Sequence, residues 1–348
     1  MPRLPLERRI NLTALRLAEQ RACRYIAASL ENPNMHLRSI PLSECEAFGH
    51  GVKRPEDVVV SRDGTVWLSD QDSACARVND DGTLSRVGQA GGAPNGINMD
   101  ARGRIVIANF GGPEDGAGPL QRLDPASGEI EVICDTLDGK RLFGCNYPVV
   151  DSRGRIWCSH STFGPLDDAF NGLDDGAIFR VEVDGTATLL ADGIRFANGI
   201  TLDADEQFLY VCETTGCDVI RYRINDDGSL GALEHYGPKL GFDNHEVQNQ
   251  RPLSLELRSQ LGLTDGCGFD SAGNLWVTLV LANKVVAITP ELEVVDVLSD
   301  PEGKLMRNPT NVTWGGDDLC DLYIGSVSTD YVIKTRSPVP GLPMIHQR

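Results

Sequence analysis

Apolar and polar positions along the chain repeat in one arrangement six times. Each copy has a polar residue near its start. A short apolar strand follows, then a polar turn, usually with Gly, and then a second apolar strand. A unit of short strands recurring about every 40 to 70 residues predicts an all-β fold, a six-bladed β-propeller. The copies are PEDVVVSRDGTVWLSD (55–70), PNGINMDARGRIVIAN (94–109), CNYPVVDSRGRIWCSH (145–160), ANGITLDADEQFLYVC (197–212), TDGCGFDSAGNLWVTL (264–279) and TNVTWGGDDLCDLYIG (310–325).

The second residue of each copy, which we call the template residue, carries an amide or a carboxylate. In a closed propeller the equivalent positions of the blades meet around one central axis. The pattern therefore predicts a ring of side-chain oxygens at one end of the channel, and a hard cation binds such oxygens. The six template residues are Glu56, Asn95, Asn146, Asn198, Asp265 and Asn311.

Turn formation is a second interpretation of some template residues, because Asn or Asp before Gly favours a turn. It applies to Asn95, Asn198 and Asp265, which all precede Gly, but not to Glu56 or Asn146. We predict that Glu56, Asn198 and Asp265 bind one divalent cation. Asn146 is predicted as a fourth ligand or a substrate contact. For Asn95 and the template residue of the sixth copy, packing at the blade entrance is the favoured interpretation.

Segments outside the copies complete the predicted architecture. Residues 6–30 have apolar residues at helical spacing and no interior Pro or Gly, so we expect a helical extension over 1–34. The remainder, 35–348, is the predicted propeller. The pattern in 35–42 predicts a strand that pairs with 331–336, because closure by two distant segments leaves no free sheet edge.

Composition narrows the classes of partner. The chain has 50 acidic and 32 basic residues, a net charge of −18 and no basic run, so we expect no nucleic acid and no membrane surface as partner. The N-terminal MPRLPLERRI lacks the apolar core of a signal peptide, and the 10 Cys include no CxxC pair. We therefore expect a cytoplasmic protein with free thiols and no structural zinc site. A homo-oligomer formed through the N-terminal helix stays open.

Three of the copies carry motifs that resemble a known family. ANGITLDADEQFLYV, TDGCGFDSAGNLWVT and TNVTWGGDDLCDLYIG are similar to motifs of the senescence marker protein/gluconolactonase family, which includes regucalcin. The resemblance extends over about residues 52–335 and includes all six copies in order. It implies a divalent cation at the top of a six-bladed propeller and hydrolysis of lactones. By matching motif the ligands here would be Glu56, Asn146, Asn198 and Asp265.

The activity that we expect is metal-dependent hydrolysis of a lactone at the top of the channel. The cation would polarise the lactone carbonyl, and Asp265 would activate water or act as nucleophile. His160, at the end of a strand in the third copy, is a second catalytic candidate. Calcium is the first choice of cation, with magnesium, manganese and zinc as alternatives. Two other functions stay open: a related metal-dependent conversion, such as organophosphate hydrolysis or non-hydrolytic lactone or enol chemistry, and ligand binding without catalysis.

Substrate contacts are predicted near the same mouth. Regucalcin-like members of the family have an Arg two residues before the third template residue, where this chain has Gly144. We therefore expect a bulkier and less polar lactone than gluconolactone. The connection 237–263 is long for a propeller loop and is expected to cover the mouth. The predicted contacts are Asn95, Arg141, Asn146, Tyr147 and His160.

Overall fold

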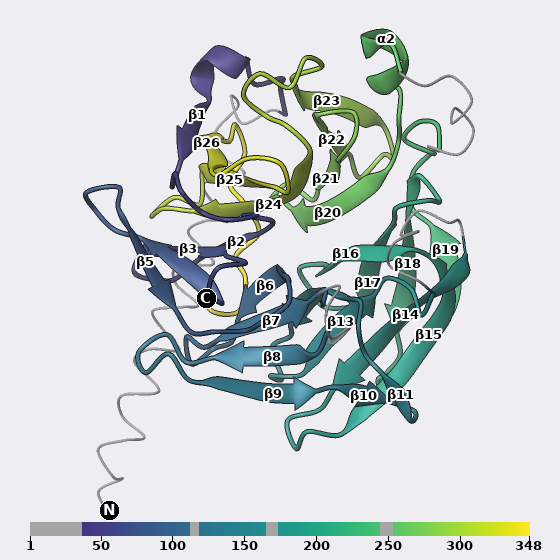
Figure 1. The fold of residues 1–348 in the computed structure, drawn as a ribbon. Helices are drawn as coiled ribbons and strands as arrows, with labels where there is room; N and C mark the ends of the chain where they lie inside the picture. Colours follow the sequence, from purple (N-terminus) through teal and green to yellow (C-terminus); the bar gives the residue numbers. More distant parts are fainter. Residues whose placement is uncertain (1–36, 112–117, 165–172, 244–252) are drawn as a thin grey trace, which may run out of the picture.

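The computed structural model describes residues 37–111, 118–164, 173–243 and 253–348. Six four-stranded antiparallel sheets stand around a central axis (Figure 1). The prediction of a six-bladed β-propeller is confirmed, and the two strands of each sequence copy are the two inner strands of one blade. The predicted N-terminal helix, 6–30, lies outside the described residues, as do parts of the long connections, 165–172 and 244–252.

Each of blades 1 to 5 uses four consecutive strands, which run from the axis outward. Blade 1 has β2 (Val58–Val60), β3 (Val66–Ser69), β4 (Cys75–Val78) and β5 (Leu84–Val87). Blade 2 has β6 (Pro94–Met99), β7 (Ile105–Asn109), β8 (Leu120–Leu123) and β9 (Ile130–Cys134). Blade 3 has β12 (Cys145–Val150), β13 (Ile156–His160), β14 (Asp174–Val181) and β15 (Ala187–Arg195).

The second half of the ring follows the same order. Blade 4 has β16 (Ala197–Leu202), β17 (Phe208–Glu213), β18 (Asp218–Ile224) and β19 (Leu230–His235). Blade 5 has β20 (Thr264–Phe269), β21 (Leu275–Leu279), β22 (Lys284–Ile288) and β23 (Val294–Ser299). Smaller elements are the hairpin β10 (Thr136–Leu137) and β11 (Lys140–Arg141), the 3-10 helix η1 (Leu42–Glu44) and the one-turn helix α2 (Leu255–Arg258).

Blade 6 closes the ring with strands from both ends of the chain. Its inner strands are β24 (Pro309–Gly315), β25 (Asp321–Ser326) and β26 (Val332–Arg336), and its outer strand is β1 (Glu46–Phe48). Closure onto the C-terminal strand is as expected, but the predicted strand at 35–42 is wrong. The pairing strand lies further along the chain, with Ala47 opposite Ile333, and 37–45 holds only η1.

Close approach of the inner strands, not turn formation, explains the Gly that follows three template residues. Gly96, Gly199 and Gly266 lie inside strands, and none has a positive φ. A Cβ on Gly266 would lie 2.2 Å from Oδ1 of Asn311, and one on Gly199 would lie 2.5 Å from Cα of Gly266. Neighbouring blades are therefore packed backbone to backbone at the axis, and the turn interpretation is wrong for these positions.

The Asp before most template turns fixes the far end of the inner hairpin. In blade 3, Asp151 accepts hydrogen bonds from the turn amides of Arg153 and Arg155 and from Nε1 of Trp157 at 3.0 Å. Asp270 of blade 5 binds its own turn and Trp276 in the same way. The Asp thus satisfies turn amides and orients the indole that packs between blades.

Apolar side chains between adjacent sheets form the core. Trp276 of blade 5 and Trp314 of blade 6 pack edge to face with centroids 5.4 Å apart. The nine Cys among the described residues are all free thiols, as expected. Within the described ranges no helix has the length and apolarity needed to cross a membrane.

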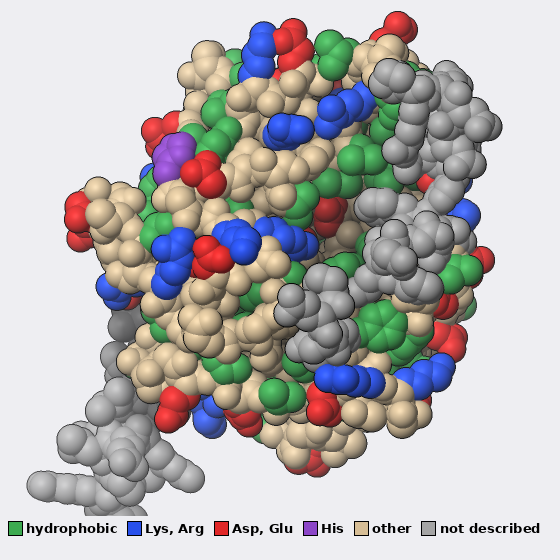
Figure 2. All heavy atoms as spheres, viewed as in Figure 1, with side chains coloured by type: hydrophobic (Ala, Val, Ile, Leu, Met, Phe, Trp, Pro, Cys, Tyr) green, Lys and Arg blue, Asp and Glu red, His purple; other side chains and the backbone are tan. Residues whose placement is uncertain are grey.

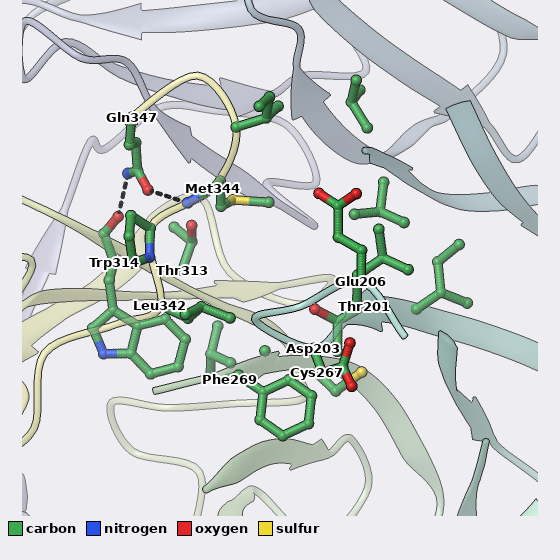
Figure 3. Close-up of a pocket in the computed structure, with 18 of the residues that line it drawn as sticks. Thr201, Asp203, Glu206, Cys267, Phe269, Thr313, Trp314, Leu342, Met344 and Gln347 are labelled. Atoms are coloured by element: carbon green, nitrogen blue, oxygen red, sulfur yellow. Dashed lines mark hydrogen bonds between the residues drawn. The ribbon is translucent and has the colours of Figure 1, made fainter. Parts of the chain in front are cut away.

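The C-terminal segment 342–348 closes the end of the channel opposite the template residues. Leu342 donates its amide to the carbonyl of Phe269, and Gln347 donates to the carbonyl of Trp314 at 2.9 Å (Figure 3). Nε2 of His346 lies 2.9 Å from the carbonyl oxygen of Val60. The segment lines a pocket together with inner strands of blades 3 to 6, so it forms a floor to the channel.

Candidate functional site

The structure brings five of the six template residues together at the mouth of the channel. Figure 2 shows acidic side chains at the bottom of a hollow in the centre of this face, with basic side chains at its rim. Four of the residues are the second residue of an innermost strand, and Glu56 lies two residues before β2, so the fold delivers them to one level. All five are buried: Glu56, Asn95, Asn146, Asn198 and Asp265.

Asn95 joins residues from blades 1, 2 and 3. Its Nδ2 donates to Oε1 of Glu56 at 3.0 Å and to Oδ1 of Asn146 at 3.0 Å. Its Oδ1 accepts a hydrogen bond from Nη2 of Arg54 at 2.6 Å. Asn95 therefore orients two predicted cation ligands through its nitrogen, which is more specific than packing at the blade entrance.

Hydroxyl groups hold the amides of blades 3 and 4. Nδ2 of Asn146 donates to Oγ of Ser161 at 2.9 Å, and Nδ2 of Asn198 donates to Oγ1 of Thr214 at 3.0 Å. Each hydroxyl belongs to the first residue after the second strand of the same blade. Because the nitrogen of each amide donates to a hydroxyl of its own blade, the amide oxygens keep a lone pair for a ligand, although that of Asn146 also accepts a hydrogen bond from Asn95.

The two carboxylates share a buried environment. Burial raises the pKa of Glu56 well above its usual value, and the charge of Asp265 raises it further, while Arg54 opposes the change. Burial raises the pKa of Asp265 to about 8, against the opposing effects of Arg54 and a hydrogen bond with Asn198. Two carboxylates held this close in a buried site repel each other, and a bound cation would offset that repulsion.

The residues present fit a hard divalent cation. Oε2 of Glu56 is buried and has no hydrogen-bond partner among the described residues. The donors are carboxylate and amide oxygens of mixed charge, which suit Ca²⁺ or Mg²⁺. No group of three or more His, Cys, Asp or Glu side chains in the described part of the chain is arranged to hold a metal. A cation here would therefore depend on the amide oxygens of Asn146 and Asn198 as well as on Glu56 and Asp265.

A second polar layer lies directly below the mouth. Nδ2 of Asn311 donates to Oδ1 of Asp57 at 2.6 Å and to the hydroxyl of Tyr147 at 2.7 Å. Asp57 also accepts from the amide of Ile97 at 2.6 Å, and burial raises its pKa to about 7. Asn311 and Tyr147 thus join blades 1, 3 and 6 below the predicted ligands, and Tyr147 occupies the space beside Gly96.

His160 lies beside the predicted ligands but is engaged by the backbone. Its Nε2 lies 3.2 Å from the amide of Gly144 and accepts that hydrogen bond, and its ring stacks on Phe163 with centroids 4.1 Å apart. Burial lowers the pKa of His160 to about 3. The imidazole is therefore neutral and its Nε2 lone pair is already used.

Gly144 has little room for a side chain. A Cβ there would lie 3.3 Å from the carbonyl oxygen of Thr162 and 3.6 Å from His160. Arg141, the alternative sugar contact, is exposed on the small hairpin β10–β11. Neither residue places a positively charged side chain among the hydrogen-bonded residues at the mouth.

Arg54 is the residue at the mouth that the sequence analysis missed. Its Nη1 donates to the carbonyl of Pro94 at 3.2 Å, and its Nη2 donates to Asn95. It lies two residues before Glu56, and its backbone has a φ of 57°. A lone Arg before Pro gives no sequence signal, because its place depends on contact with the next blade.

The chain is similar in sequence to proteins that are named as sugar lactonases. It is 30% identical over 178 residues to a 6-deoxy-6-sulfogluconolactonase of Pseudomonas putida, over 51% of this chain and 52% of that protein. It is 27% identical over 186 residues to the pentonolactonase XacC of Haloferax volcanii, over 53% of this chain and 54% of that protein. The chain thus spans about half the length of the curated relatives it matches.

Solved structures share the fold. A gluconolactonase from Xanthomonas campestris superposes with a TM-score of 0.64 at 21% identity, over 87% of this chain and 94% of that one. Regucalcin, a calcium-binding protein from Agrobacterium tumefaciens, superposes with a TM-score of 0.61 at 16% identity, over 88% and 95%. The family model for the SMP-30/gluconolactonase/LRE-like region matches residues 91–328. That match covers 238 of the 348 residues, so the chain belongs to the SMP-30/gluconolactonase/LRE-like family.

Proposed function

We propose that this protein hydrolyses a lactone at the mouth of the propeller channel with the help of one divalent cation. Glu56, Asn146, Asn198 and Asp265 would hold the cation, and calcium is the first choice. The observation that carries the proposal is the buried pair of carboxylates, Glu56 and Asp265, beside amides that are anchored through their nitrogens. A scaffold without chemistry has no need of this costly arrangement.

The bound cation would supply Lewis-acid polarisation of the lactone carbonyl and a lowered pKa of water. Asp265 would accept a proton from the attacking water. The water oxygen forms a bond to the carbonyl carbon, the ring C–O bond breaks, and the ring oxygen leaves with a proton as a hydroxyl group. The products are a hydroxycarboxylate and one proton released to solvent at neutral pH.

The chain's own residues would orient these groups. Asn95 holds Glu56 and Asn146 in place through its amide nitrogen. Ser161 and Thr214 fix the rotation of the two ligand amides. With Nε2 of His160 bound to the backbone, proton transfer rests on Asp265 and not on the imidazole.

Support for lactones as substrates comes from the relatives. Both matched relatives carry names of sugar lactonases, and the regucalcin that shares the fold is named a calcium-binding protein. The geometry of the mouth supports the proposed metal dependence and the proposed position of the site. Hydrolysis of a phosphate ester or a non-hydrolytic conversion would use the same cation but would release no carboxylate from a lactone.

The test is proton release from a lactone panel, followed with a pH indicator, with and without a chelator. The panel contains glucono-1,5-lactone, a pentonolactone and dihydrocoumarin. We expect hydrolysis that a chelator abolishes and one added cation restores. Hydrolysis that survives complete chelation would overturn the metal-dependent mechanism, and failure on the whole panel would overturn the lactonase proposal.

A further inference from the structure

The position two residues before each template residue holds a different residue type in each blade. Two residues before the six template residues stand, in order, Arg54, Ala93, Gly144, Phe196, Leu263 and Pro309. Only Arg54 in this set is charged, and only Phe196 is aromatic. Blades 1 and 4 face each other across a six-membered ring, so the backbones of these two residues lie on opposite sides of the axis (Figure 1).

Both residues are held in a backbone conformation that side-chain-bearing residues seldom adopt. Arg54 has a φ of 57° and Phe196 a φ of 58°. The carbonyl of Arg54 accepts from the amide of Glu56 at 2.8 Å, and the preceding amide, of Lys53, donates to Asp70 at 3.1 Å. The left-handed region costs roughly 1–2 kcal/mol for such a residue, and strain of this kind concentrates at functional sites.

The guanidinium of Arg54 is fixed but not neutralised. Its two acceptors, the carbonyl of Pro94 and Oδ1 of Asn95, are uncharged groups. Among the residues that the structure describes, no carboxylate forms an ion pair with Arg54, although both Glu56 and Asp265 feel its charge. A guanidinium has five N–H donors, so donors remain for a ligand at this half-buried position.

The aromatic side of the mouth is built from two rings. Phe196 of blade 4 lies with its centroid 6.3 Å from that of Phe110, which follows β7 of blade 2. The pair spans blade 3, so one part of the rim is apolar while Arg54 makes another part cationic. A ligand in the mouth would therefore meet charge at one end and an aromatic surface at the other.

We propose that Arg54 recognises a carboxylate or another oxyanion carried by the substrate, and that an anionic lactone is preferred over a neutral one. This inference rests on the proposed lactonase function. A forked guanidinium matches the geometry of an oxyanion, and its fixed backbone lowers the entropy lost on binding. The absence of an Arg at position 144 is then compatible with a charged substrate, because Arg54 of blade 1 supplies the positive charge.

A purely structural role for Arg54 makes a different prediction. Through Asn95 it positions Glu56 and Asn146, and loss of that effect would slow all substrates alike. The discriminating quantity is therefore a ratio of kcat/KM values for two lactones that differ only in charge. D-glucaro-1,4-lactone and D-glucono-1,4-lactone serve, because they share a ring and differ in a carboxylate in place of a CH₂OH group.

The variants are Arg54→Gln, Arg54→Lys and, as matched control, Lys53→Gln. Lys53 is the neighbouring exposed cation, paired with Asp72 at 3.1 Å. We expect the wild type to prefer the glucarolactone and Arg54→Gln to lower the kcat/KM ratio roughly 10- to 100-fold, mainly through KM for the anionic lactone. The kcat/KM ratio of Arg54→Lys should lie between those of the wild type and Arg54→Gln, and Lys53→Gln should keep the wild-type ratio.

Binding of D-glucarate, followed by titration calorimetry, provides a readout that needs no turnover. We expect at least a tenfold weaker affinity in Arg54→Gln than in the wild type. An unchanged affinity, or an equal fall in kcat/KM for both lactones, would overturn the proposal. If neither lactone is hydrolysed, the proposed function fails on this pair while the glucarate titration still decides the role of Arg54.

Discussion

The two ends of the channel are built from the same six strands but differ in the polarity of the side chains that they present. At the mouth the inner strands present carboxylates and amides, among them Glu56 and Asp265, with a buried oxygen of Glu56 left without a partner. At the floor the strands present apolar groups such as Phe269 and Trp314, and the segment 342–348 covers them with backbone and side-chain hydrogen bonds. The mouth therefore leaves carboxylate and amide oxygens for a ligand, whereas the floor is closed by the chain itself.

The contrast separates residues kept for chemistry from residues kept for the fold. Two carboxylates at the mouth have raised pKa values and cost stability, whereas Asp151 near the floor accepts hydrogen bonds from turn amides and from Trp157. Glu56 and Asp265 at the mouth therefore contribute differently to stability from Asp151 near the floor. Four changes test this comparison.

The largest effect is expected at the mouth, from Asp265→Asn. Loss of this carboxylate should lower kcat/KM by about 10³-fold or more and remove most cation binding, because we propose Asp265 both as a cation ligand and as the proton acceptor. The melting temperature should stay level or rise, since one of two repelling buried charges is gone. Lactone assays, calorimetric titration with Ca²⁺ and thermal denaturation check these results.

Asp151→Asn is the matched control. It should keep most of the activity and lose stability, because its carboxylate holds the turn and the indole of Trp157. If Asp265→Asn instead unfolds the protein and keeps kcat/KM in the remaining folded fraction, the assignment of function to the mouth is wrong.

The next effect concerns the axis between the two ends, where blades meet backbone to backbone. Gly266→Ala should lower the free energy of unfolding by about 2–4 kcal/mol, because its Cβ would lie 2.2 Å from Oδ1 of Asn311 and 2.4 Å from the carbonyl oxygen of Thr310. Gly231→Ala on the outer strand β19 is the control, since its Cβ would lie 3.4 Å from Arg223. Urea unfolding measures both, and equal effects would contradict backbone contact at the axis as the cause.

Removal of residues 342–348 tests the floor. We expect a loss of about 1–3 kcal/mol in the free energy of unfolding, because the contacts to Phe269, Trp314 and Val60 disappear. Below the new melting temperature KM at the mouth should be unchanged within about twofold. A large rise in KM with preserved folding would show that the two ends are coupled.

The last effect is a pH dependence that comes from the floor and is absent at neutral pH. Burial lowers the pKa of His346 to about 4, although a hydrogen bond to Val60 and the charge of Asp100 oppose this. The unfolded chain takes up this proton first, so wild-type stability should fall as the pH drops from about 6.5 to about 4, by at most about 1.4 kcal/mol per pH unit for one proton.

The variant His346→Gln keeps a hydrogen-bond donor for the carbonyl of Val60 and removes the titrating imidazole. The difference in unfolding free energy between wild type and variant should therefore shrink steadily as the pH falls through this window. The other buried histidine, His160, is present in both proteins and cancels in the difference. A pH-independent difference would mean that His346 does not titrate between these limits.

Sequence predicted the blades and their inner strands because these strands are short, apolar and regularly spaced. The sequence pattern missed the strand whose extended conformation depends only on pairing with a neighbouring strand. Glu46–Phe48 has no strand pattern of its own and is extended only because β26 lies beside it, whereas the more apolar 35–42 was predicted.

At the site, sequence predicted the template residues because they occupy one register position. It did not predict which way their neighbours point. Tyr147 follows Asn146 and its hydroxyl lies in the layer below the mouth, next to Asn311, because it fills the space that Gly96 leaves. Arg54 and the bonding of His160 depend on contacts between blades or with a backbone amide, and no local pattern encodes those.

The closing strand β1 has a consequence for how the protein is made. Its three residues pair with β26, which lies some 290 positions later, so a chain leaving the ribosome carries β1 unpaired until β26 has been synthesised. Five blades can assemble before that moment, while blade 6 is incomplete until β26 pairs with β1. Closure of the ring is thus an event of high contact order, and we expect the open intermediate to expose apolar sheet faces that favour aggregation.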